Sequence, residues 1–220
     1  PLASGKIEMK YMTAKEEDIL TNQNYITQGV VIDKLIQSLI VDKTVDYSQL
    51  LVGDKNALLV ASRILGYGAE YEFAYGGQKQ IIDLSSLENK ELKEDSFTKG
   101  KNEFDYTLPA TGTKIKFKFL THGDEVLIDE EITSIRKINK QASPEISTRL
   151  KHMIVDVNGE TDKNKIREFV DNAFLARDAR AFRKYIQELQ PDINLKFYPE
   201  NSPEEGVDIP IGITFLWPDA

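Results

Sequence analysis

Apolar residues recur at steps of three and four in two blocks of the chain, which predicts amphipathic helices there. The first block precedes residue 66, and the second runs from residue 124 to residue 189. Thr13 and Glu16 have the spacing of a capping box, which predicts where the first helix begins. The expected helices cover residues 14–25, 31–41, 55–65, 124–140, 145–155, 162–170 and 175–189.

Between and after these blocks, apolar and polar residues alternate, which is typical of strands with one buried face. The expected strands cover residues 6–11, 70–75, 79–84, 103–108, 114–120, 193–198 and 207–217. Gly76-Gly77 and the segment 109–113 provide turn residues between neighbouring strands, so both pairs are predicted to be hairpins. The polar stretch 85–102 is predicted to be a loop.

Runs of helices and runs of hairpins, without regular βαβ alternation, are typical of α+β folds. We therefore expect an α+β protein in which helical segments flank two or three antiparallel β-hairpins. A chain of 220 residues can bury one core or two small ones. We expect one unit over residues 1–220. The alternative is a subdivision into three parts. Residues 1–84 would contain helices and a hairpin, residues 85–120 the loop and a hairpin, and residues 121–220 helices and a hairpin.

The composition excludes several classes of function. The chain has no cysteine, which excludes disulfides, thiolate zinc sites and cysteine nucleophiles. It has 28 basic and 36 acidic residues and a net charge of −8, which argues against nucleic-acid binding. No apolar run approaches the ~18 residues that span a bilayer, and no signal-peptide pattern follows the first residue. We expect a soluble protein of a reducing compartment that binds neither nucleic acid nor membrane.

Two short basic stripes have local explanations. Lys114, Lys116 and Lys118 alternate with apolar residues and are predicted to lie on the solvated face of a strand. Arg177 and Arg180 lie at helical spacing on the predicted helix 175–189, beside further basic residues. They form either a solvated helix face or a contact surface for an acidic protein partner.

Candidate catalytic chemistry is sparse. Neither a nucleophile elbow nor a glycine-rich phosphate loop is present. His122 is predicted to be a turn or cap residue and His152 a partly exposed helical residue, without a nucleophile nearby in sequence. The segment 156–162 resembles the start of a calcium loop, but its glycine comes too early, so Asn158-Gly159 is better explained as a tight turn. The residues predict no enzyme, no cofactor, no metal and no small-molecule substrate.

Seven segments resemble one family, the baseplate (hub) proteins of T-even-like contractile-tailed bacteriophages. The resemblance covers nearly the whole chain and depends on the order and spacing of the segments, because none is a chemical motif. The segments are MTAKEEDILT (12–21), GVVIDKLI (29–36), LVGDKNA (51–57), ASRILGYG (61–68), LPATG (108–112), DARA (178–181) and FLWP (215–218).

One departure from the family concerns metal binding. Many relatives have Cys-x-x-Cys pairs in the two hairpins that correspond to residues 71–81 and 196–208, a pattern typical of a zinc-ribbon-like site. This chain has no cysteine at these or any other positions, so no metal is expected. If the fold is shared, the two hairpins are expected to come together by pairing and packing alone.

The resemblance implies a structural component of the phage tail baseplate or hub that acts through protein–protein contacts. Its partners would be other baseplate or hub proteins, and its location the virion, after assembly in the host cytoplasm. The alternative is a chaperone-like assembly factor that is absent from the mature virion, and a wall-degrading hub enzyme is disfavoured. Phe215, Leu216 and Trp217 are candidate interface residues, although core packing is the competing explanation for them.

Overall fold

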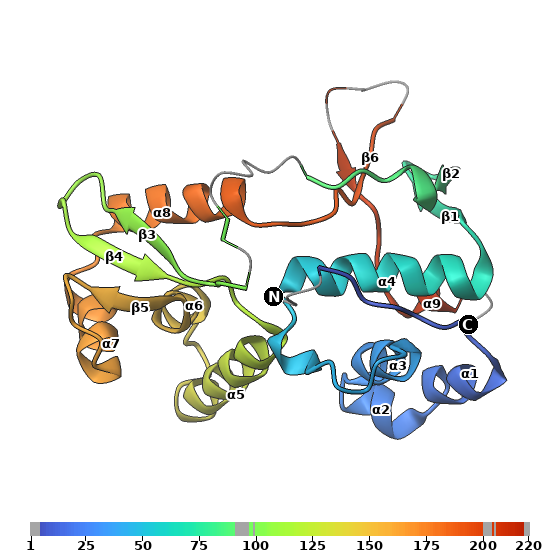
Figure 1. Ribbon diagram of the computed structural model, residues 1–220, viewed down its shortest axis with the longest axis horizontal. Helices are drawn as coiled ribbons and strands as arrows, with labels where there is room; N and C mark the ends of the chain where they lie inside the picture. The colour runs from blue at the N-terminus through green and yellow to red at the C-terminus, as the bar shows by residue number, and fades with distance from the viewer. Residues whose placement is uncertain (1–4, 91–96, 99, 200–203, 205, 218–220) are drawn as a thin grey trace. The chain divides into compact units, whose positions relative to one another are not determined.

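The computed structural model describes residues 5–90, 97–98, 100–199, 204 and 206–217, and it confirms the mixed α+β class (Figure 1). Helices are combined with three small antiparallel sheets of two or three strands in the described part of the chain. The chain forms two compact units. Unit 1 contains Pro1–Gly5, Tyr47–Val52 and Leu92–Gln190, and unit 2 contains Lys6–Asp46, Gly53–Glu91 and Pro191–Ala220. The expectation of one unit over residues 1–220, and its alternative subdivision at residues 84 and 120, stay predictions.

Unit 2 contains the N-terminal helices and two hairpins. Its helices are α1 (Ala14–Leu20), α2 (Gln23–Thr27), α3 (Val31–Leu39), α4 (Val52–Tyr67, with its first residue in unit 1), the 3-10 helix Leu84–Ser86 and α9 (Ile213–Leu216). Its strands are β1 (Glu70–Tyr75), β2 (Gln78–Asp83), β6 (Lys196–Phe197) and β7 (Val207–Asp208). Strand β1 pairs with β2, and β6 with β7. Leu20, Leu35, Ile36, Leu39, Leu84, Phe215 and Leu216 are fully or almost fully buried in this unit.

The predicted capping box at the start of α1 is confirmed, because the Glu16 carboxylate accepts hydrogen bonds from the Thr13 amide and hydroxyl. The single helix predicted over residues 14–25 is wrong. The first helix ends at Leu20 with Thr21 as its C-cap, and Asn22 caps the second, its side chain accepting from the amides of Asn24 and Tyr25 at 3.0 and 3.2 Å. A side chain that satisfies the first amides of a helix fixes its start, so α1 and α2 are separate.

Two predicted strands of unit 2 are shorter than expected or absent. In the segment 6–11 only Met9 pairs, in an isolated bridge to Ile40. In the tail, the ladder ends at Asp208 and the chain then forms the short helix α9, so the strand predicted over residues 207–217 is wrong. Pro210 interrupts this segment, and proline cannot donate to a strand ladder.

The hairpins β1–β2 and β6–β7 come together within unit 2, as expected from the sequence. The Phe197 ring of β6 packs edge-on against Phe73 of β1, with the ring centroids 5.3 Å apart. Gly76 and Gly77 form the two-residue turn between β1 and β2 with φ of 58° and 78°, a conformation that favours glycine. Aromatic packing thus joins the two hairpins.

The described part of unit 1 contains the three-stranded sheet and the helices that accompany it. Its strands are β3 (Phe104–Thr107), β4 (Lys114–Phe117) and β5 (Ile154–Val157). Its helices are the 3-10 helix Tyr47–Gln49, α5 (His122–Ile138), α6 (Glu145–Met153), α7 (Lys163–Asn172) and α8 (Ala176–Leu189). Strand β4 lies between β3 and β5 in the sheet (Figure 1). Phe117 and Phe119 pack with Phe182 of α8 in the core of this unit. Lys114 and Lys116 are exposed, as predicted for the solvated face of this strand. The prediction is wrong for Lys118, which lies beyond the end of β4 and is partly buried in an ion pair with Asp124.

Strand β5 was not expected. The helix predicted over residues 145–155 ends at Met153, and the next residues pair antiparallel with β4, Ile115 opposite Val157. The predicted turn Asn158-Gly159 follows at once, with both residues at positive φ. The predicted loop 85–102 includes Ser85 and Ser86 of the 3-10 helix and a bridge from Asn89 to Ile193, and its residues 91–96 and 99 lie outside the described residues.

Candidate functional site

The predicted interface residues of the tail are divided between core and surface. Phe215 and Leu216 are 0% exposed in unit 2, where the Phe215 ring packs edge-on against Tyr71 at 4.8 Å. Core packing therefore accounts for both side chains. Trp217 is half-buried. Contact of these residues with a partner stays a prediction.

Arg177 and Arg180 lie on α8 in unit 1, and both are exposed. Asp178, between them, is 0% exposed and accepts hydrogen bonds from the Ala110 amide at 2.7 Å and the Thr111 hydroxyl at 2.9 Å. These bonds hold the turn after β3 against α8. The two arginines are thus presented to solvent by a fixed helix, and a contact with an acidic partner stays a prediction.

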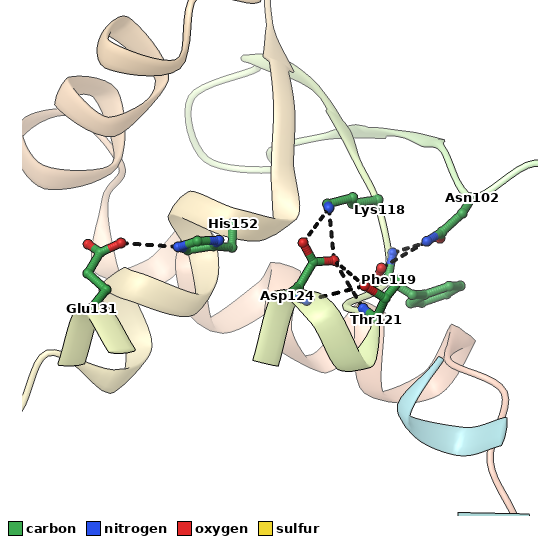
Figure 2. Close-up of polar contacts among 7 residues, drawn as sticks. All are labelled: Asn102, Lys118, Phe119, Thr121, Asp124, Glu131 and His152. Atoms are coloured by element: carbon green, nitrogen blue, oxygen red, sulfur yellow. Dashed lines mark hydrogen bonds and ion pairs between the residues drawn. The ribbon is translucent and has the colours of Figure 1, made fainter. Parts of the chain in front are cut away.

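The predicted histidines have structural surroundings. His122 is the first residue of α5, after the N-cap Thr121, and its ring packs edge-on against Tyr47. His152 lies on α6, and its Nε2 is 3.1 Å from the Glu131 carboxylate (Figure 2). Burial raises the pKa of Glu131, but hydrogen bonds from Arg167 and His152 outweigh it and hold the pKa below its usual value. Among the described residues, His152 contacts this carboxylate and no hydroxyl nucleophile.

A second polar cluster fixes the junction between β4 and α5 (Figure 2). The Lys118 ammonium donates to both Asp124 oxygens at 2.7 and 2.8 Å, and Asp124 also accepts from the Thr121 amide. The Asn102 side chain donates to the Phe119 carbonyl and accepts from the Phe119 amide, each at 2.9 Å. These groups satisfy one another, which is the arrangement of a structural clamp.

Unit 2 contains a groove of about 550 Å³ beside β1. Five consecutive β1 residues, 70–74, line it. The other lining residues are Arg63 of α4, Ile81 of β2, Thr214 of α9 and Pro210, which precedes α9. We call this feature the β1 groove. Tyr71 and Phe73 direct their buried side chains to the unit core, whereas Glu70, Glu72 and Ala74 are exposed.

Arg63 is the buried cation of the β1 groove and is only 5% exposed. Its Nη1 and Nη2 donate to the carbonyls of Gly68 and Glu70 at 3.0 Å each, and its guanidinium lies against the rings of Tyr67 and Tyr71. Its buried Nε has no hydrogen-bond partner, and no carboxylate among the described residues pairs with it. Burial lowers the pKa of Arg63, opposed by the two tyrosines. Most buried charges are paired, so this arginine is unusual.

Sequence reasoning did not single out Arg63, although a signal was present. It is the one charged residue in the apolar stretch 57–65, where a solvated position is not expected. Glu16, also buried in unit 2, was found from its spacing to Thr13.

The edge of β1 that faces away from β2 has unpaired backbone groups. The Ala69 carbonyl accepts from the Leu84 amide, one step beyond the pair Glu70↔Asp83. Bonded and non-bonded pairs alternate in an antiparallel ladder, so residues 71, 73 and 75 bond to β2. Residues 70, 72 and 74 therefore direct their N–H and C=O groups to the other edge, and the Glu70 carbonyl there accepts from Arg63. In the described chain, no further strand pairs with this edge.

No family model, curated protein or solved structure matches this chain. Among the described residues, the acidic and histidine side chains do not gather in a group of three that could hold a metal ion. None of the described helices is long and apolar enough to cross a membrane.

Proposed function

We propose that the protein is a structural component of the tail baseplate or hub of a contractile-tailed phage and acts through protein–protein contacts instead of catalysis. The seven segments that resemble this family support the biological setting. The observation that supports a contact protein most directly is the open edge of β1 beside the β1 groove.

An open strand edge is a template for pairing with another chain, and natural proteins usually cover or interrupt such edges. Hairpin β1–β2 has only two strands, and its β2 side chain Ile81 is 63% exposed. Pairing with a neighbouring subunit would both cover the edge and extend the sheet.

The quantity of the protein in purified, intact phage particles tests this proposal. Mass spectrometry would compare its copy number with that of a baseplate protein of known copy number. A structural subunit predicts a fixed ratio that fits threefold or sixfold symmetry. Absence from particles, together with abundance in infected cells, would reject the structural role and identify an assembly factor.

A hydrolysis assay tests the alternative that the protein is an enzyme. Hydrolysis of purified peptidoglycan that is abolished by substitution of one carboxylate would contradict the non-catalytic proposal. We expect no such activity from the purified protein.

A further inference from the structure

We infer that the β1 groove is the docking site for an extended segment of a partner protein that carries a carboxylate. The carboxylate pairs with Arg63, and the backbone of the segment pairs with the open edge of β1. That the partner is a protein rests on the proposed function. The preference for a carboxylate rests on the groove alone.

The charge of Arg63 supports an anionic occupant. Removing a cation from water is costly unless a counter-charge and hydrogen-bond acceptors replace the water. The two backbone carbonyls supply acceptors for Nη1 and Nη2, but they supply no negative charge, and Nε has no acceptor. A carboxylate that lies in the groove beside the guanidinium supplies the missing charge.

The acidic side chains of the groove favour a single negative charge over a phosphate. Glu72 is paired with Lys79 at 2.6 Å, and Glu70 is exposed at the same edge. Like charges repel, and the repulsion is larger for a phosphate dianion than for a carboxylate. The groove is therefore expected to select a carboxylate, from a side chain or a chain end.

The shape of the groove supports an extended occupant. It follows five consecutive residues of one strand, a length of about 13 Å at the usual rise per strand residue. The backbone groups of Glu72 and Ala74 point to this edge and can pair with an added strand. Strand addition obtains affinity from such main-chain hydrogen bonds and specificity from side-chain contacts.

The test is a nuclear magnetic resonance titration of the purified full-length protein. The probe is acetyl-Val-Thr-Val-Thr with a free C-terminal carboxylate, and its matched control is the same peptide with a C-terminal amide. Sodium acetate and sodium phosphate are titrated separately. The signals followed are the Nε–H of Arg63 and the backbone amides of Glu72 and Ala74.

We expect the carboxylate peptide to shift all three signals in a saturable manner. It should bind about tenfold or more tightly than the amide peptide, because a charge-assisted hydrogen bond is lost in the amide. Arg63→Gln should remove this preference, and Arg183→Gln, at an exposed position on α8, should leave it unchanged. If Arg63→Gln does not fold, Arg63→Lys should fold with a weakened preference, since lysine keeps the charge without the planar fork.

Other outcomes would overturn the inference. Equal binding of both peptides, or no shift of Arg63, would show that Arg63 only ties α4 to β1. Binding of acetate without the peptide would show a small-molecule carboxylate site and reject strand addition, and tighter binding of phosphate would reject the carboxylate preference. The particle measurement is independent of this titration, so either result can fail while the other stands.

Discussion

Glu16 is a fully buried carboxylate, and its replacement by glutamine is expected to destabilise unit 2. One carboxylate oxygen accepts from the Lys10 ammonium at 2.7 Å and the Ser38 hydroxyl at 2.8 Å. The other accepts from the Thr13 amide at 3.0 Å and the Thr13 hydroxyl at 2.6 Å. The charged form thus joins α1 to the segment before it and to α3.

The pKa of Glu16 gives the size of this stabilisation. Burial raises the pKa, but the hydrogen bonds from Lys10, Thr13 and Ser38 outweigh it and lower the pKa from 4.5 to about 2. This difference corresponds to about 3 kcal/mol of stability. Because the folded-state pKa is lowered, the stabilisation is fully present above pH 4.5 and is lost as the pH falls toward 2.

Urea unfolding of Glu16→Gln, followed by Trp217 fluorescence, measures the effect. Trp217 is the single tryptophan of the chain and belongs to unit 2, so its signal reports on this unit. The variant should be less stable than the wild type by about 3 kcal/mol at pH 7 and by only about 1 kcal/mol at pH 3, where the charge of Glu16 contributes less. Asp18→Asn, at an exposed position on the same helix, is the matched control and should change stability little.

A loss smaller than about 1 kcal/mol at pH 7 would refute the reasoning, because a buried carboxylate with four donors should contribute more. An equal loss at pH 7 and pH 3 would refute it as well. In that case the effect would come from packing, and the charge of Glu16 would not be responsible.

Two further substitutions test local packing and hydrogen bonding. Gly53→Ala places a Cβ 2.0 Å from the Pro191 carbonyl oxygen. The free energy of unfolding of unit 2, measured with the Trp217 assay, should fall by about 1–3 kcal/mol. The control Gly212→Ala meets no atom within 4 Å and should be tolerated. Asn102→Ala removes both hydrogen bonds to the Phe119 backbone and should lower the stability of the fold by about 2 kcal/mol. Circular dichroism should show this loss as a lower melting temperature. An unchanged melting temperature would show that these bonds are dispensable.

The elements that could be predicted from the sequence are those with strong local signals. The hairpins flanking Gly76-Gly77 and the turn after β3 have alternating side chains and turn residues, and the structure contains both. The helices with long apolar stripes, such as α5 and α8, also lie close to their predicted positions. In these segments the local pattern and the final packing agree.

The elements that could not be predicted depend on contacts distant in sequence. Ile154 and Val155 continue the pattern of the predicted helix 145–155, but pairing with β4 makes them part of strand β5, and this partner is about forty residues away. The tail helix α9 is only four residues long and is held by burial of Phe215 and Leu216. Such short elements take their conformation from tertiary packing instead of propensity.

The candidate site was the least predictable feature for a related reason. A basic residue in a helix is usually solvated, and only the fold shows that Arg63 is buried next to a strand edge. The edge itself depends on strand pairing, and a sequence pattern does not show which strand edge stays open.

Cross-linking mass spectrometry on intact phage particles tests the central claim most directly, namely that this chain contacts baseplate neighbours through hairpin β1–β2. Lys79 reports on the hairpin and is 79% exposed, and Lys184 on α8 is 78% exposed and serves as the reference. We predict that amine cross-links from Lys79 reach one neighbouring protein reproducibly and outnumber those from Lys184. Recovery of the protein in particles with cross-links from Lys184 and none from Lys79 would contradict this account.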